Sequence, residues 1–436
     1  MTTTTVSLPS SAARHKPRRL EGNGEKTLLE QISDPAFLQQ AWSVLNRRNR
    51  SSHGLDQESV ANFATRLPEN IATVSTALRS GAFLFQPARA TTIPKPGRSE
   101  RRPLRIFNVR DRLVQKAILL CIEPYFPDIR NDVSFAFIRE QSVARAINAV
   151  KRGPALGYKF ILLADIKSFF EKIDRQKLRL AITSRLPDNT LDELITQAIE
   201  TDIGNRSALS SEEQTLFPTG STGVAQGSIL SPFFSNVYMV GFDKFLIEHD
   251  HRVVRYADDL AVLAKTRHEA EQLHSTISDY LRRELGLEVY PLTGKKASRI
   301  AHLTGGFDFL GIRFEVRRKS WHLEPSPSKC REIFSEVRRW TSPNNAWPLL
   351  DRLVILSRKF EGWMRCYRRV CSTRVFVQQL DELLTDRVHE LLRTRGLIGK
   401  DVILTRVQRR FLGIQKSVRS PKRTIFLPEG LHGVRT

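Results

Sequence analysis

The chain has 436 residues, of which 40% are hydrophobic, so it is long enough for two or three packed domains and too apolar for wholesale disorder. Lysine and arginine number 69 against 46 acidic residues, which gives a formal net charge of +23. This charge attracts polyanions, so nucleic acid is the expected partner and an anionic membrane surface is a much weaker alternative.

Two further features of the composition bear on location. No apolar stretch reaches the length of a membrane span, and the N-terminus lacks the apolar centre of a signal peptide, so we expect no membrane contact and a cytoplasmic protein. The cysteines are widely spaced, which is typical of buried free thiols in a reducing compartment and predicts no zinc site; they are Cys121, Cys330, Cys366 and Cys371.

The predicted elements begin with a polar tail. Residues 1–26 are rich in threonine, serine and basic residues, which predicts a flexible basic tail. Residues 27–90 have apolar positions at mixed spacings of three and four, which predicts a helical N-terminal extension. Between Ile93 and Lys116, eight basic residues and two acidic ones surround the turn-forming sequence PKPGRSERRP. This segment predicts a basic hairpin that leads into a helix.

The middle of the chain, residues 134–316, alternates helix and strand signals and predicts a mixed α/β unit. Within it, GVAQGSILSPFFSNVYM predicts a glycine turn followed by an apolar helix, and residues 268–285 predict a second helix. A strand is expected over GFDFLGIRFEV, residues 306–316. From about Pro325 the sequence becomes helical, and residues 331–436 hold 22 basic residues against 10 acidic ones.

Three carboxylates are expected to meet at one end of the predicted sheet. The apolar run FILLA predicts a buried strand that ends at Asp165, while Asp258 and Asp259 lie in the turn of a predicted β-hairpin. Because neighbouring strands lie about 5 Å apart, pairing of these strands would gather the acids. A cluster of acids repels itself unless cations bind, and Mg²⁺ prefers carboxylate and phosphate oxygens. Each acid taken alone is also typical of a strand-end cap or a solvated turn.

Ordered motifs extend this interpretation. The string RYADDL, residues 255–260, follows LLADIKSFFEKID and GVAQGSILSPFFSNVYM in the order and spacing of the palm motifs of reverse transcriptases, and the chain resembles that family. GFDFLG resembles the primer-grip motif, and IPKPGRSERRPL resembles the basic fingers motif. The similarity covers roughly residues 90–370. The sequence LSRKFEGWMRCYRR, residues 356–369, is similar to a thumb or maturase helix of bacterial group II intron-like enzymes.

The resemblance implies a fold and an activity. The fold is α+β, the right-hand polymerase fold with fingers, a palm with an antiparallel sheet and a helical thumb. Fingers and palm are expected over residues 91–325, and a basic, maturase-like thumb over residues 326–436. The implied enzyme is an RNA-directed DNA polymerase, a nucleotidyltransferase that extends a primer 3′-hydroxyl with dNTPs. Its implied partners are an RNA template and a DNA primer or product, and its cofactor is a pair of Mg²⁺ ions, with Mn²⁺ as substitute.

The resemblance also implies roles for particular residues. Asp165, Asp258, Asp259 and the carbonyl of Ile166 match ligands of the two Mg²⁺ ions. Phe170 matches the bulky residue that excludes a ribose 2′-hydroxyl, with a plain core phenylalanine as the alternative interpretation. The remaining matches are nucleotide contacts at Gln226 and Gly227, triphosphate contacts at Lys95 and Arg102, and a proton donor to pyrophosphate at Lys296 or its neighbour Lys295.

Some sequence features depart from the family pattern. RPLRIFNVRDR lacks the glycine and proline that many intron-encoded enzymes have after RPL, and SFAFIREQSVARAI is poor in glycine. With no nuclease-like module before Thr436, we expect a free-standing enzyme that copies a dedicated noncoding RNA in antiviral defence, or one from a retroelement. The alternative function is a maturase-type splicing helper that binds RNA on a polymerase scaffold. Template identity, priming mode, oligomeric state and the choice among defence, intron mobility or splicing, and repair stay open.

Overall fold

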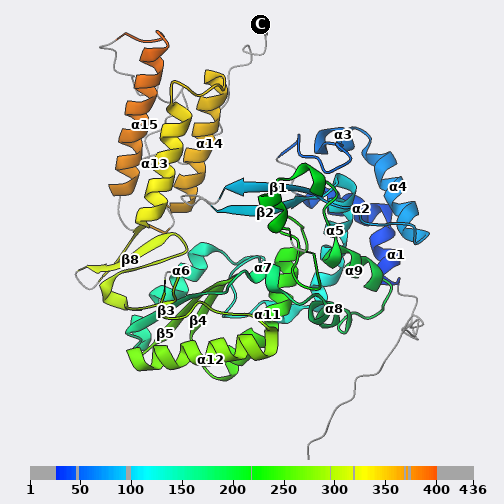
Figure 1. Cartoon of the computed structure of the whole chain (residues 1–436), viewed down its shortest axis with the longest axis horizontal. Coiled ribbons are helices and arrows are strands. Elements are labelled where there is room, and N and C mark those ends of the chain that lie inside the picture. The colour runs from blue at the N-terminus through cyan, green and yellow to red at the C-terminus, as the bar shows by residue number, and fades with distance from the viewer. Residues whose placement is uncertain are drawn as a thin grey trace, which may run out of the picture.

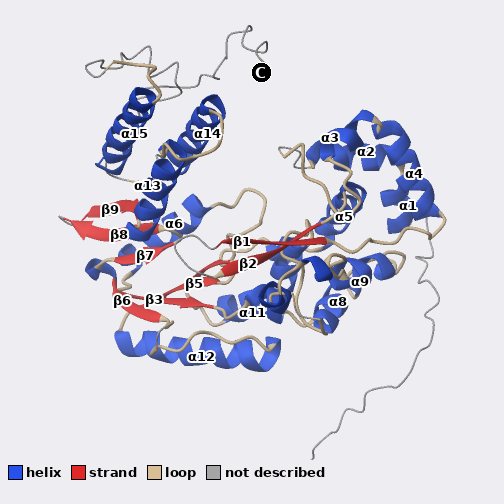
Figure 2. Ribbon diagram, turned by 45° about the horizontal axis from the view of Figure 1, so that its top comes forward, coloured by secondary structure: helices blue, strands red, loops and turns tan. Residues whose placement is uncertain are grey.

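The computed structural model describes residues 26–45, 49–94, 100–217, 219–294, 296–317, 320–367, 370–371 and 375–399. Helices and antiparallel sheets are combined in three regions (Figures 1 and 2). In Figure 1 the N-terminal helices lie on the right, and a four-stranded sheet lies at the lower left with a bundle of long helices standing above it. We call this sheet the central sheet because its strands come from the middle of the chain. Among the described residues, none of the helices combines the length and apolar character that crossing a membrane requires.

The N-terminal region is helical. Thr27 caps the first helix in a capping box with Glu30, and the Asp34 side chain accepts a hydrogen bond from the Ala36 N–H at the start of the second. The apolar faces of these helices join the main core, where they meet the first helix of the next region. The elements are α1 (Leu28–Ser33), α2 (Pro35–Val44), α3 (Val60–Thr65) and α4 (Leu67–Arg79).

A basic hairpin follows. Strands β1 (Arg89–Pro94) and β2 (Arg101–Ile106) pair antiparallel and lead into helix α5 (Val109–Ile122), as the sequence predicts. Alternation along β2 sends Arg101 and Arg105 to one face and Arg102 to the other. Arg101 donates to the Thr92 hydroxyl on the first face. The hairpin therefore presents Arg102 on the opposite face from these two arginines.

Short helices connect the hairpin to the central sheet and its covering helices. The connecting elements are η1 (Glu123–Tyr125), η2 (Pro127–Ile129), α6 (Val143–Lys151), η3 (Pro154–Leu156), α7 (Phe169–Lys172), α8 (Arg175–Thr183), α9 (Asp192–Glu200), η4 (Arg206–Ala208) and α10 (Ser211–Thr215). The long helices on the sheet are α11 (Ser231–Glu248) and α12 (Arg267–Leu285), both close to the predicted positions.

The central sheet has the strand order β4-β5-β3-β6 and is antiparallel throughout. Its strands are β3 (Phe160–Asp165), β4 (Val253–Tyr256), β5 (Asp259–Ala264) and β6 (Arg299–His302). Side chains alternate between two cores: Leu162 and Val262 join the core with α11 and α12, whereas Ile161 and Leu263 join the core with α6 and the C-terminal helices. Both faces of the sheet are therefore covered.

A second sheet corrects the single strand expected over residues 306–316. The segment folds back at Leu310 and Gly311, both with positive φ, so that Phe309 pairs with Ile312. The result is a hairpin that a further strand extends into a three-stranded antiparallel sheet. Its elements are η5 (Leu303–Gly305), β7 (Phe307–Phe309), β8 (Ile312–Arg317) and β9 (Ser320–Pro325).

Three long helices form the C-terminal bundle: α13 (Pro327–Thr341), α14 (Leu349–Tyr367) and α15 (Val375–Thr394). Their apolar faces share one core with the second sheet, and Tyr367 is buried in it. Arg352 is also fully buried, and its guanidinium donates to the carbonyls of Trp340 and Ser342 at the end of α13. These bonds satisfy carbonyls that a helix end leaves unpaired and fix α14 against α13.

Candidate active site

The structure brings the predicted acids together at one end of the central sheet. Asp165 ends β3 and Asp259 begins β5, and the two are direct partners in the antiparallel ladder. Cross-strand partners have Cα atoms about 4.5 to 5.5 Å apart and side chains on the same face. The carbonyl of Asp258 accepts a hydrogen bond from the Ile166 N–H at 3.2 Å. The turn that carries Asp258 is thus bonded to the chain that follows Asp165.

The turn between β4 and β5 is tight and strained. Tyr256 pairs with Asp259, so that only Ala257 and Asp258 lie between the strands. Ala257 has φ of 58°, in the left-handed region that non-glycine residues rarely adopt. Such a conformation costs about 1 to 3 kcal/mol and persists only where the surroundings hold it.

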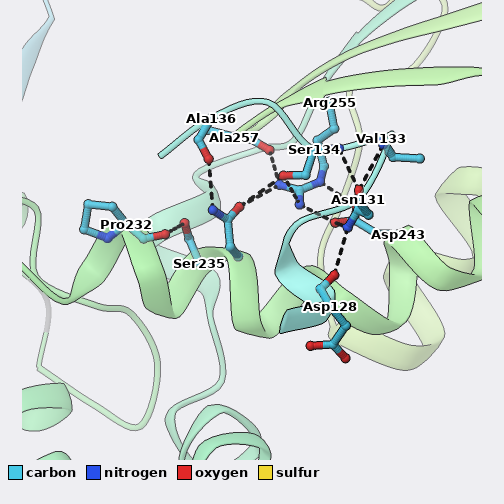
Figure 3. A network of polar contacts seen from close by, with 11 residues as sticks. Asp128, Asn131, Val133, Ser134, Ala136, Pro232, Ser235, Asp243, Arg255 and Ala257 are labelled. Atoms are coloured by element: carbon cyan, nitrogen blue, oxygen red, sulfur yellow. Dashed lines mark hydrogen bonds and ion pairs between the residues drawn. The ribbon is translucent and has the colours of Figure 1, made fainter. Parts of the chain in front are cut away.

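A buried ion pair lies directly beneath this turn (Figure 3). Arg255 and Asp243 are almost completely buried, and the guanidinium meets both carboxylate oxygens, at 2.7 and 2.5 Å. The same guanidinium donates to the Ser134 hydroxyl at 2.8 Å, the Asn236 amide oxygen at 3.3 Å and the Ala257 carbonyl at 3.4 Å. Arg255 therefore connects helix α11 to the strained residue that precedes Asp258.

The network extends to the loop beside β4. The Asn236 amide donates to the Ala136 carbonyl at 2.9 Å, and Asn131 donates to the Asp243 carboxylate at 3.2 Å. Backbone hydrogen bonds from Arg255 to Val133 and from Phe135 to Arg255 add a parallel bridge at the edge of the sheet. This satisfied polar network positions the turn from below, in the way that buried networks fix a unique local geometry.

The electrostatics of the acids are unfavourable without a cation. Although Asp259 is exposed to solvent, enough protein surrounds its carboxyl group that desolvation, together with the charges of Asp258 and Asp165, raises its pKa to about 7. Desolvation also raises the pKa of Asp258, whereas the positive charge of Arg102 lowers it. The acids are held close enough to repel one another, so cation binding would relieve a repulsion that the fold imposes.

The donor set fits a hard divalent cation in its chemistry. Carboxylate and carbonyl oxygens are the ligands that Mg²⁺ prefers, and the mutual repulsion of the acids favours a bound positive charge. As the side chains stand, no three His, Cys, Asp or Glu residues in the described part of the chain converge on a single metal position. The end of the sheet therefore carries oxygen donors of the kind that Mg²⁺ prefers.

The predicted nucleotide-contact residues lie on two segments that are bonded to each other. The Val224 N–H donates to the Phe170 carbonyl at 2.8 Å, and the Gln226 side-chain amide donates to the Glu171 carboxylate at 2.6 Å. Phe169 is buried, while Phe170 is half-buried at the edge of the core. The segment after Asp165 thus lies against the segment that carries Gln226.

Gly227 lies where only glycine fits. Its φ is 112°, and a Cβ atom there would come within 2.2 Å of the Arg105 carbonyl oxygen. The adjacent Gln226 carbonyl accepts a hydrogen bond from the Arg105 N–H at 2.7 Å. Close approach at Gly227 therefore attaches strand β2 of the basic hairpin to the loop before α11.

The structure describes two of the four basic residues that the sequence analysis assigned to the site. Arg102 is exposed on β2, and its charge lowers the pKa of Asp258, so its guanidinium lies within electrostatic range of the acids. Lys296 lies in the loop before β6, where its ammonium group pairs with Glu100 at 3.2 Å. Lys95 and Lys295 lie outside the described residues.

Two groups of residues were missed by the sequence analysis. Glu171 follows the two phenylalanines of LLADIKSFFEKID, and nothing local in the sequence indicates that it meets Gln226. Asn236 and Asp243 are polar residues on the buried face of the otherwise apolar helix α11, and that contrast was a usable signal. A buried acid on an apolar helix requires a partner, and Arg255 provides it.

Together, the hairpin, the antiparallel sheet with paired acids and the helical bundle make up the right-hand polymerase fold, with fingers, palm and thumb in chain order. Residues 93–314 match the family model of the reverse transcriptase (RNA-dependent DNA polymerase), and the chain belongs to this family. The protein is accordingly an RNA-directed DNA polymerase, a nucleotidyltransferase whose partners include an RNA template.

Two similar proteins and one solved structure can be compared with this chain. The chain is 27% identical over 340 residues to protein YkfC of Escherichia coli K12, covering 68% of this chain and 84% of YkfC. It is 23% identical over 296 residues to the group II intron-encoded protein LtrA of Lactococcus lactis, covering 68% of this chain but only 44% of LtrA. A solved partial Cas6-RT-Cas1–Cas2 complex shares 24% identity with a TM-score of 0.37, covering 59% of this chain and 42% of that chain. Within the reverse transcriptase family, the chain is thus similar to bacterial proteins that include a group II intron-encoded protein.

Proposed function

We propose that the protein extends a primer 3′-hydroxyl with dNTPs along an RNA template, at the end of the sheet where Asp165 and Asp259 pair. The observation that carries this proposal is the ladder register that sets these two acids opposite each other, with Asp258 in the adjoining turn. Asp165, Asp258, Asp259 and the Ile166 carbonyl would hold two Mg²⁺ ions there. Bound Mg²⁺ supplies charge neutralisation and activates a hydroxyl nucleophile in phosphoryl transfer, and Mn²⁺ has the same ligand preference.

In this proposal the protein's own residues bind and orient the nucleotide. Arg102, which already lies within electrostatic range of Asp258, and Lys95 bind the triphosphate, because a guanidinium can bind two phosphate oxygens at once. Phe170 occupies the space that a ribose 2′-hydroxyl would need, which selects deoxynucleotides. Gln226 and Gly227 contact the nucleotide. Lys296 gives a proton to the departing pyrophosphate after it leaves Glu100.

The thumb and the basic tails are proposed to bind the nucleic acid backbone. Residues 331–436 hold 22 basic residues against 10 acidic ones, so binding should be largely independent of sequence and should weaken steeply with salt. We further propose a cytoplasmic protein that copies a dedicated noncoding RNA, in antiviral defence or within a retroelement. The similarity to an intron-encoded protein supports the retroelement alternative, and we propose that a membrane plays no part in the function.

Primer extension tests the proposed reaction. An RNA template annealed to a DNA primer is incubated with dNTPs and Mg²⁺, with wild-type protein and with Asp258→Ala. We expect incorporation by the wild type alone, and loss of incorporation when Mg²⁺ is chelated. Equal background incorporation by the two proteins would eliminate the polymerase reaction and leave an RNA-binding role.

The template is tested separately. RNA that copurifies with the wild-type protein is sequenced and compared with RNA from a preparation washed at high salt. Enrichment of one structured RNA encoded near the gene supports a dedicated template. A sample that mirrors the cellular RNA pool would contradict it.

A further inference from the structure

The contact between Glu171 and Gln226 joins two segments of the site that are far apart in the chain. The Gln226 Nε2 atom donates to Glu171 Oε1 at 2.6 Å, a short distance for a nitrogen donor. Both side chains are partly exposed to solvent.

The chemistry of this pair decides which end of the amide is free. An ionised carboxylate accepts hydrogen bonds and has none to donate, whereas an amide has a donor end and an acceptor end. Glu171 can therefore hold only the NH₂ end of Gln226. The carbonyl oxygen Oε1 of Gln226 is then left as the group that a nucleotide meets. A neutral or absent neighbour would allow the amide to present either end.

The pair is not needed to hold the two segments together. Two backbone hydrogen bonds already do so: the Val224 N–H donates to the Phe170 carbonyl at 2.8 Å, and the Gly223 N–H donates to the Ile173 carbonyl at 2.7 Å. The Arg105 N–H of strand β2 also holds the Gln226 carbonyl, at 2.7 Å. The side-chain contact comes in addition to these bonds. Its removal should change the orientation of one amide while the backbone keeps its place.

We propose that Glu171 is a positioning residue for nucleotide selection, which acts by turning the Gln226 carbonyl oxygen toward the incoming dNTP. The site then favours a nucleotide group that donates a hydrogen bond at this point. This inference rests on the proposed function, because Gln226 contacts the nucleotide only if dNTPs bind beside the paired acids. It assigns Glu171 an effect on nucleotide affinity that requires Gln226 to be present.

Glu171 also influences Asp258, and this effect must be distinguished from its effect on Gln226. Its charge also raises the pKa of Asp258, so its loss could act through the acids that bind the metal. The two routes differ in what they change. Action through Gln226 raises the KM for dNTP, whereas action through Asp258 changes the Mg²⁺ concentration that gives half-maximal activity.

A double-mutant cycle tests the inference by steady-state primer extension with Glu171→Ala, Gln226→Ala and the double variant. We expect Glu171→Ala to raise the KM for dNTP about tenfold with a smaller change in kcat, the size expected for one charge-assisted hydrogen bond. In the Gln226→Ala background the same substitution should change KM by less than about twofold, because the partner is gone. If Glu171→Ala raised the KM for dNTP by the same factor with and without Gln226, the inference would be overturned.

Further variants separate orientation from charge and from folding. Glu171→Gln keeps an acceptor but permits a reversed amide pair, so its KM should lie between those of the wild type and Glu171→Ala. Glu288→Ala removes another nearby carboxylate, one that pairs with Lys167, and should leave the KM for dNTP unchanged. Thermal unfolding of each variant should match that of the wild type.

The outcomes separate this inference from the proposed function. A shift in the Mg²⁺ requirement of Glu171→Ala, with KM for dNTP unchanged, would overturn the role of the amide in favour of the route through Asp258. An active wild type with an unaltered Glu171→Ala variant would overturn the inference alone. A wild type without any incorporation would overturn the proposed function and this inference together.

Discussion

The ion pair of Arg255 and Asp243, beneath the turn between β4 and β5, gives a prediction that combines stability and activity. Asp243→Asn keeps the shape of the side chain but removes the negative charge that faces Arg255. The guanidinium would then stay fully buried with neutral partners only, at Ser134, Asn236 and the Ala257 carbonyl. Loss of one partner of a buried pair typically costs about 3 to 5 kcal/mol, so we expect a loss in this range from the free energy of unfolding.

Urea unfolding followed by circular dichroism measures this loss, with Glu288→Gln as the control. Glu288 pairs with Lys167 at the surface, and exposed pairs of this kind contribute little to stability. The stability loss of Asp243→Asn should therefore be clearly larger than that of Glu288→Gln. A loss below about 1 kcal/mol for Asp243→Asn would refute the reasoning that desolvation makes this pair costly to break.

A second variant separates stability from positioning. Arg255→Met combined with Asp243→Leu replaces the pair with apolar side chains of similar length, which is often neutral for stability. We expect this double variant to recover most of the lost stability. The recovery is incomplete because the side chains of Asn131 and Asn236 lose their hydrogen bonds to Asp243 and Arg255. Primer extension should stay low, because the strained Ala257 carbonyl then lacks its donor. Full activity in this double variant would show that the turn needs no support from Arg255.

Three further predictions concern single residues. Burial raises the pKa of Asp111 to about 6, so the folded protein keeps this proton where the unfolded chain has lost it, and its contribution to stability falls as pH rises from about 4 to about 6. Urea unfolding at several pH values should show this slope in the wild type and a flatter one in Asp111→Asn. Gly227→Ala should lose at least about 2 kcal/mol and most activity, because the new Cβ would clash with the Arg105 carbonyl at positive φ. Gly362 lies in open space on α14, so Gly362→Ala should instead stabilise the protein by up to about 1 kcal/mol. A thermal unfolding experiment in which Gly227→Ala is more stable than Gly362→Ala would contradict both glycine arguments.

The central sheet was the part of the fold most readable from sequence. Continuous apolar runs predict buried strands, and the structure confirms the strand that ends at Asp165 and the hairpin with Asp258 in its turn. Strands β6 and β9 were not foreseen. They lie at the edges of their sheets, and β6 has only four residues with exposed ends, so neither shows a period that a pattern can detect.

The second sheet shows a different limit. Residues 306–316 have the apolar content of one strand, and the turn falls at Leu310, whose φ of 49° is unusual for leucine. Hairpin turns are usually marked by asparagine or glycine at both central positions, so Leu310 concealed the turn. The pair of Glu171 and Gln226 was hidden for a related reason, since a contact between residues 55 positions apart depends on how two loops meet. Local pattern carries no information about such a meeting.

The order of strands in the central sheet has a consequence for synthesis of the protein. Within the described residues, β3 pairs with β5 and β6, both made much later in the chain. Strand β3 leaves the ribosome before residues 259–264, which form its partner strand β5, have emerged. Until then its edges are unpaired, and exposed apolar strands of this kind are prone to aggregate. We therefore expect the end of the central sheet that carries Asp165 and Asp259 to form late in translation, and nascent chains to depend on chaperones until strand β5 emerges.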